Sequence, residues 1–306
     1  MNVAPLLGHG TPERPGPGPL PVELLRALQI EVGRRMEGML AGDYRSSRYG
    51  EGVELAQVRP YEPGDDVRKI EWNVTARTGQ PHVRVHLAER VLVTWLLLDT
   101  SPSMHFGTGE RRKADVADGV AIAVGHVATR RGNRLGVLTF GDASPATLPP
   151  AQGRHGLVGL LAALDREPET ERVGATSLGR AIARADAIAR QRGVVVIVSD
   201  FRGPLDWRKP LLDLMSRHDV FAVEIRDARE QELPDIGELW LVDPETGRQI
   251  RVDTRSETLR SRFAAAAAEE RSGVARVLTS LGIRHCVLST SGDWLRAFAD
   301  FLGGRR

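Results

Sequence analysis

The chain is poor in cysteine and has no long apolar run. Its 306 residues include one cysteine, Cys286, so an intrachain disulfide and a cysteine-based metal cluster are excluded, which fits a reducing compartment. No apolar run approaches the roughly 18 residues that a membrane-spanning helix needs. The first 21 residues lack the basic and apolar regions of a secretory signal. These absences predict a cytoplasmic protein without a membrane span.

Lysine is also scarce, and the charge is nearly balanced. The chain has 42 basic and 40 acidic residues, and all but three of the basic residues are arginine. A nucleic-acid-binding protein gathers its positive charge on one face. Here arginine and acidic residues are interspersed along most of the chain. The sequence therefore predicts no nucleic-acid partner.

Several enzyme motifs are missing. The chain has no Gly-x-x-x-x-Gly-Lys-Ser/Thr loop, no Gly-x-Gly-x-x-Gly after a predicted strand and no Gly-x-Ser-x-Gly elbow. The eight histidines show no metal-ligand spacing such as His-Glu-x-x-His. These absences exclude a P-loop ATPase and favour a protein that is not an enzyme.

Three regions follow one another along the chain. Residues 1–20 are rich in proline and glycine, which predicts a disordered tail. Residues 21–90 predict an N-terminal helix over 22–40, followed by a small antiparallel β-region with strands near 53–55 and at 82–87. Residues 91–306 form the third region, a single predicted α/β domain.

The third region alternates between buried strands and helices. The runs 91–98 and 194–198 are almost entirely apolar, as is typical of strands buried on both faces of a parallel sheet. Helical stretches separate the strands, and a β-hairpin over 238–252 interrupts the series. The pattern predicts a doubly wound, mainly parallel sheet of the Rossmann type.

Oxygen-bearing side chains follow two of these strands and precede one helix. Open α/β sheets bind ligands at the carboxyl ends of their strands. We therefore expect these side chains to gather along one edge of the sheet. Carboxylates and hydroxyls suit a hard divalent cation, here Mg²⁺ with Mn²⁺ as the alternative. The predicted metal ligands are Asp99, Ser101, Ser103, Thr176 and Asp200.

Each signal also has a simpler interpretation. Serine, threonine and aspartate are common helix caps, and each of these ligands taken singly is explained equally well in that way. A second acidic pair, Asp65 and Asp66, has two interpretations: a further cation site, or salt bridges to the nearby arginines Arg59 and Arg68. Salt bridges are the simpler explanation of this pair.

The five predicted ligands resemble, in order and strand context, the metal-ion-dependent adhesion site (MIDAS) of von Willebrand factor A (vWA) domains. The likeness covers residue 91 to about the C-terminus. Residues 59–72, which read RPYEPGDDVRKIEW, and the Ala76-Arg77 pair resemble the signature of a bacterial domain-of-unknown-function family, number fifty-eight. Members of that family carry a vWA-like domain. The resemblance implies action with a MoxR-type AAA+ ATPase in assembling or activating client proteins.

Three hypotheses follow. The first is a non-enzymatic, Mg²⁺-dependent interaction protein, in which an acidic residue of the ATPase or its client completes the coordination of the ion. The second is a metal-dependent hydrolase or phosphatase that uses the same site, centred on Asp99. The third is a structural scaffold whose site holds no ion. The first is preferred, because no histidine or glutamate is clearly placed in the three loops to act as a base.

Overall fold

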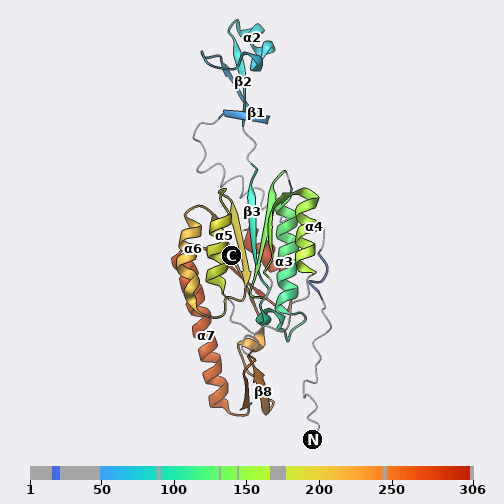
Figure 1. Ribbon diagram of the computed structural model, residues 1–306, viewed down its shortest axis with the longest axis vertical. Coiled ribbons are helices and arrows are strands. Elements are labelled where there is room, and N and C mark those ends of the chain that lie inside the picture. Colours follow the sequence, from blue (N-terminus) through green and yellow to red (C-terminus); the bar gives the residue numbers. More distant parts are fainter. Residues whose placement is uncertain are drawn as a thin grey trace. The chain divides into compact units, whose positions relative to one another are not determined.

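The computed structural model describes residues 16–20, 49–87, 91–130, 132–142, 145–165, 177–243 and 247–303. These residues fall into two compact units (Figure 1). Residues 49–87 and Val91 belong to the smaller unit, and residues 16–20 and 92–303 belong to the larger one. The predicted helix over 22–40 and the predicted ligand Thr176 lie outside the described residues.

The smaller unit is a two-stranded antiparallel sheet with short helices in its connection. Strand β1 (Tyr49–Pro60) pairs with β2 (His82–Leu87), whose bounds are those predicted. The connection holds a 3-10 turn, η1 (Val67–Lys69), and a helix, α2 (Trp72–Thr78), which was not predicted. Helix α2 has only seven residues, too few for a periodic apolar stripe to stand out in the sequence.

The acidic pair of the smaller unit forms salt bridges with arginine. Arg59 donates two hydrogen bonds to the carboxylate of Asp65, at 2.8 and 2.7 Å. Arg68 donates to both carboxylate oxygens of Asp66 at 3.1 Å. The salt-bridge interpretation of this pair is therefore confirmed.

The larger unit is built on a six-stranded sheet of order β10-β7-β6-β3-β4-β5. Five strands run parallel, and β5 pairs with β4 in the antiparallel direction, so the doubly wound, mainly parallel sheet is confirmed. The strands are β3 (Val93–Asp99), β4 (Arg134–Phe140), β5 (Thr147–Gln152), β6 (Val194–Ser199), β7 (Asp219–Arg226) and β10 (Arg284–Ser289). Strand β5 was not predicted, because it carries two consecutive prolines, which a sheet tolerates only at its edge.

Helices cover both faces of this sheet (Figure 1). One face packs against α3 (Lys113–Ala128), α4 (Gly153–Leu164) and α8 (Trp294–Gly303). The other packs against α5 (Leu178–Ile188), α6 (Arg208–Met215) and α7 (Glu257–Ser280). All seven residues of β3 are buried, and Trp95 and Leu97 join the core under α5, α6 and α7. Burial on both faces explains why this strand is almost purely apolar.

Smaller elements complete the unit. The predicted hairpin is confirmed as β8 (Glu238–Val242) and β9 (Gln249–Asp253), and three 3-10 turns lie in the loops: η2 (Pro102–His105), η3 (Leu205–Trp207) and η4 (Ala228–Glu230). Pro17, within the predicted tail, accepts a hydrogen bond from the Trp294 indole at 3.0 Å. Among the described helices, none is long and apolar enough to cross a membrane.

The order of the strands reverses beside β3. The chain continues from β3 to β4 on one side of it and later returns to β6 on the other side. Such a switch point opens a crevice at the carboxyl ends of the strands, where α/β proteins bind ligands. The fold thus places the ends of β3 and β6 side by side at its natural binding position.

Candidate functional site

Two carboxylates lie at the switch point. Asp99 is the last residue of β3, and Asp200 directly follows β6. The two strands are paired up to Leu98 and Val198, so their ends are adjacent. The exposed fractions of Asp99 and Asp200 are only 2% and 6%. Two acidic side chains are therefore buried together, an arrangement that is costly without compensating charge or hydrogen bonds.

Two of the predicted hydroxyls lie beside them. The backbone N–H of Ser101 donates to Asp99 Oδ1 at 3.0 Å, and the hydroxyl oxygens of Ser101 and Ser103 are 3.0 Å apart. Ser101 directly precedes η2 but makes no side-chain capping bond to it. Helix capping therefore does not explain Ser101. The structure brings together four of the five predicted ligands, and the fifth, Thr176, lies outside the described residues.

Ser199 is a site residue that the sequence analysis missed. Its hydroxyl donates to Asp99 Oδ2 at 2.6 Å and accepts a bond from the backbone N–H of Phe201 at 3.0 Å. Phe201 has a φ of 54°, a left-handed backbone that is rare for an aromatic residue. The chain therefore turns sharply after Asp200, and Ser199 ties that turn to Asp99. A signal for Ser199 was present in the sequence, because it is the polar last residue of an otherwise aliphatic strand.

Gly141, which follows β4, was also missed. Its φ is 92°, and a Cβ atom built there would lie 2.7 Å from Ser101 Cβ and 2.9 Å from Asp99 Oδ1. Real Cβ atoms do not approach other atoms so closely. A glycine at this position therefore lets the backbone after β4 pack directly against the oxygen cluster.

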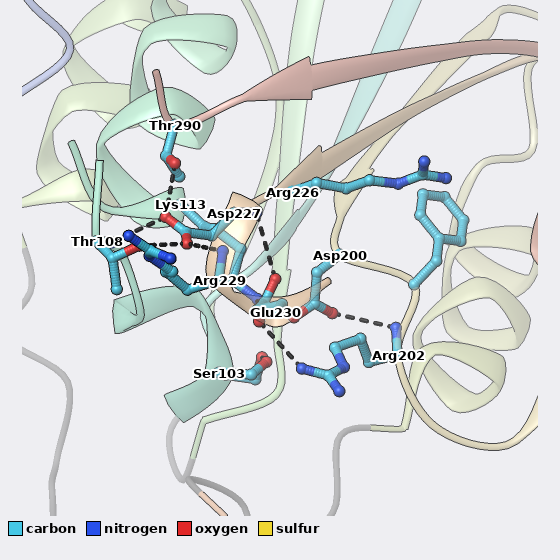
Figure 2. A network of polar contacts seen from close by, with 12 residues as sticks. Ser103, Thr108, Lys113, Asp200, Arg202, Arg226, Asp227, Arg229, Glu230 and Thr290 are labelled. Carbon is cyan, nitrogen blue, oxygen red and sulfur yellow. Dashed lines mark hydrogen bonds and ion pairs between the residues drawn. The ribbon is translucent and has the colours of Figure 1, made fainter. Parts of the chain in front are cut away.

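A buried ammonium stands next to Asp200 (Figure 2). Lys113 begins α3, and its Nζ lies 2.6 Å from Asp200 Oδ2 and 2.6 Å from Glu230 Oε1. Arg202 donates its Nη1 to the same Glu230 oxygen at 3.0 Å. Neither Lys113 nor Glu230 was predicted as a site residue. Glu230 lies near the site, but Lys113 and Arg202 both donate hydrogen bonds to its carboxylate. It is therefore not a free base.

The network continues to Asp227, which is 1% exposed. Thr108 donates both its backbone N–H, at 2.8 Å, and its hydroxyl, at 2.6 Å, to this carboxylate. The hydroxyl of Thr290 and the backbone N–H of Arg229 donate to it at 2.7 and 2.8 Å. Asp227 therefore accepts four hydrogen bonds, and these connect its own loop to the loops of Thr108 and Thr290. We interpret it as a structural residue.

The two site carboxylates have opposite electrostatic surroundings. Burial, and next the negative charge of Asp200, raise the pKa of Asp99 to about 7. Burial alone would also raise the pKa of Asp200, but the Lys113 ammonium and its hydrogen bond outweigh it and hold that pKa below the usual range. Among the described residues, Asp200 therefore has a compensating cation and Asp99 has none.

The donor atoms fit a hard divalent cation. They are carboxylate and hydroxyl oxygens, which Mg²⁺ prefers, and no cation of the described ranges balances the charge of Asp99. Within the described ranges, no three His, Cys, Asp or Glu side chains are grouped so as to hold a metal ion. An ion here would therefore depend on the serine hydroxyls as well as on the carboxylates.

Comparison with known proteins places the chain in a family. The model of the family described as "Protein of unknown function DUF58" matches residues 57–273. "Uncharacterized protein Rv1480" of Mycobacterium tuberculosis is 39% identical over 287 residues, which cover 92% of this chain and 89% of that protein.

Two solved structures resemble the fold. BatB, a conserved hypothetical protein from Bacteroides thetaiotaomicron, is 15% identical with a TM-score of 0.46, over 70% of this chain and 98% of that one. A von Willebrand factor type A protein from Catenulispora acidiphila is 15% identical with a TM-score of 0.38, over 73% and 43%. Both likenesses concern the fold alone. The match to the family model, together with the mycobacterial relative, shows that the chain belongs to the DUF58 family.

Proposed function

We propose that the chain is a non-enzymatic protein-interaction module that binds its partner through a Mg²⁺ ion. Asp99, Ser101 and Ser103 would hold the ion directly, with Thr176 and Asp200 contributing directly or through water. When bound, the ion supplies a Lewis-acidic coordination position for a carboxylate of the partner. The observation that carries the proposal is the cluster of buried oxygens around Asp99, a carboxylate that no cation of the described residues compensates.

Charge supports a role in binding. Two carboxylates at most balance a divalent ion, and Asp200 is already paired with Lys113. An ion beside Asp99 would therefore keep a net positive charge. A glutamate or aspartate of another protein is the natural ligand for such an ion. Family membership supports a MoxR-type AAA+ ATPase, its client protein or both as the partner.

The hydrogen bonds of the site favour this binding role over a hydrolase or phosphatase. Both Asp99 oxygens accept hydrogen bonds, from Ser101 N–H and from the Ser199 hydroxyl. Glu230 is held by Lys113 and Arg202. Glu230, whose carboxylate both basic side chains engage, is therefore not available as a general base beside Asp99.

A pull-down from a lysate of the source cell tests the proposal. Wild type, Asp99→Ala and Asp213→Ala would each be used with Mg²⁺ and with EDTA. Asp213 is an exposed carboxylate on α6, so its variant controls for the loss of one negative charge. The expected result is an AAA+ ATPase or client that wild type and Asp213→Ala retain with Mg²⁺ only, and Asp99→Ala never retains. Partners that ignore both EDTA and the Asp99 substitution would contradict the mechanism.

A further inference from the structure

Lys113 is a lysine at the N-terminal end of a helix, where positive charge is unfavourable. It is the first residue of α3, and the helix dipole disfavours positive charge at that end. Its side chain is 0% exposed, whereas that of Lys209 on α6 is 88% exposed. Burying an ammonium group is costly unless it is paired and hydrogen-bonded. The location of Lys113 is therefore explained by its partners and not by the helix that it begins.

Both carboxylate oxygens of Asp200 accept hydrogen bonds. Lys113 Nζ donates to Asp200 Oδ2 at 2.6 Å, and the backbone N–H of Arg202 donates to Oδ1 at 3.1 Å. Ser103 also hydrogen-bonds to this carboxylate. Glu230 holds the ammonium from its other side, at 2.6 Å, so Lys113 is fixed between two acidic groups. A metal ion that used Asp200 directly would share that carboxylate with the Lys113 ammonium.

Asp99 is different. Its two oxygens accept bonds from the Ser101 N–H and the Ser199 hydroxyl, and both of these donors are neutral. In the part of the cluster that the structure describes, Asp200 therefore has a cationic partner and Asp99 has none. A positive charge fixed beside Asp200 also repels a metal ion bound to the same oxygen cluster, and the repulsion is stronger where water is excluded.

We propose that Lys113 is an intramolecular counter-cation that competes with the divalent ion for Asp200 and so keeps that ion weakly held. This inference rests on the proposed function, because it concerns the same site. With Asp200 bound to Lys113, Asp99 is the one predicted carboxylate ligand that no described cation compensates. It therefore retains positive charge for the acidic residue of a partner. Lys113 is a positioning residue: it sets the affinity and charge of the site through Asp200.

Calorimetric titration of the metal-free protein with Mg²⁺ tests this role. The variants are Lys113→Met, which removes the charge but keeps most of the side-chain length, and Lys209→Met as the matched surface control. Lys113→Met is expected to bind Mg²⁺ about tenfold or more tightly than wild type, because Asp200 becomes available and a nearby positive charge is lost. Lys209→Met is expected to bind as wild type does.

Thermal unfolding with and without Mg²⁺ gives a second measurement. Lys113→Met leaves Asp200 and Glu230 buried without their ammonium, so its melting temperature should be below that of wild type in EDTA. Mg²⁺ should raise its melting temperature by more than it raises that of wild type. Lys113→Met combined with Glu230→Gln removes one of the two carboxylates that lose the ammonium, and it provides a second variant if the single substitution is too disruptive.

The outcomes separate the two proposals. If wild type binds Mg²⁺ and Lys113→Met binds it no more tightly, the role of Lys113 is overturned while the metal site stands. If neither protein binds Mg²⁺, the proposed function itself fails, and this inference fails with it. If both Lys113 variants fail to fold even with Mg²⁺, the role is also overturned, since the ion would then not replace the ammonium.

Discussion

The hydroxyl of Ser199 on β6 donates to the carboxylate of Asp99 on the neighbouring strand β3 at 2.6 Å. The same hydroxyl accepts the backbone N–H of Phe201, so one atom connects Asp99 to the sharp turn after Asp200. Both residues of the pair are buried, Ser199 at 1% and Asp99 at 2% exposure. The two loops of the site are therefore held together by the sheet and by this bond, before any ion is considered.

Ser199→Ala should lower the free energy of unfolding by about 1–3 kcal/mol, because it removes a buried donor from a carboxylate and an acceptor from Phe201 N–H. Chemical denaturation measures the loss. Ser280→Ala, at an exposed serine on α7, is the control and should stay within about 0.5 kcal/mol of wild type. Equal stability of the two variants would show that the Ser199 bond contributes nothing.

Gly141→Ala should be strongly destabilising, by more than about 2 kcal/mol, because the new methyl group would overlap Ser101 and Asp99 and the backbone has a positive φ. Gly203→Ala is a matched control: its φ is 101°, but no atom lies within 4 Å of a Cβ built there. It therefore isolates the cost of the backbone conformation. Similar losses in the two variants would refute the close approach at Gly141.

Without metal, the stability of the protein should depend on the ionisation of Asp99. Its folded pKa of about 7 lies above its ordinary value of 3.8, so the folded state holds a proton that the unfolded state has released. Stability is then greatest below about pH 4 for this group and falls as the pH rises toward 7, by at most about 4 kcal/mol. Asp99→Asn should remove this contribution and stabilise the metal-free protein at pH 8.

Denaturation curves from pH 4 to pH 8 in EDTA check this, with the difference between wild type and Asp99→Asn as the quantity of interest. That difference cancels groups common to both, such as His126 and His218, whose pKa values burial lowers. A constant difference across this range would mean that Asp99 is ionised in the folded protein throughout.

Mg²⁺ affinity should fall as the pH drops below 7, because the ion requires the deprotonated form of Asp99. Titrations at several pH values in wild type measure this. Affinity that does not change between pH 5.5 and pH 8 would argue against Asp99 as a ligand.

The purified protein should not hydrolyse p-nitrophenyl phosphate with Mg²⁺ at a rate above that of Asp99→Ala, because Glu230 is engaged by two basic side chains and cannot serve as a free base. A phosphatase assay with both proteins tests this. Saturable turnover that the Asp99 substitution abolishes would favour the hydrolase alternative.

Much of the fold could be predicted from local patterns. Strand β2 has the bounds that the sequence indicated, because a strict alternation persists along it, and β6 consists of the predicted apolar run 194–198 and one further residue. Strand β5 was missed, since its two prolines conceal a strand that only the edge of a sheet accommodates. Helix α2 was missed because seven residues show no period.

The site was predictable in part. Asp99 and Asp200 follow apolar strands, so the rule that ligands lie at carboxyl ends was enough to place them together. Lys113 and Glu230 were not predictable in this way, because their contacts depend on how the start of α3 and the turn after β7 meet in three dimensions. One signal for Lys113 was present: it is one of only three lysines in a chain that otherwise uses arginine.

The most direct test of the account is anomalous diffraction from crystals soaked in Mn²⁺, which substitutes for Mg²⁺ at oxygen sites. The account predicts a peak at the end of β3, within about 2.3 Å of side-chain oxygens of Asp99, Ser101 and Ser103. Lys113 should still be bound to Asp200. No peak at this position, in crystals where Mn²⁺ has bound elsewhere, would contradict the central claim that these oxygens form a metal site.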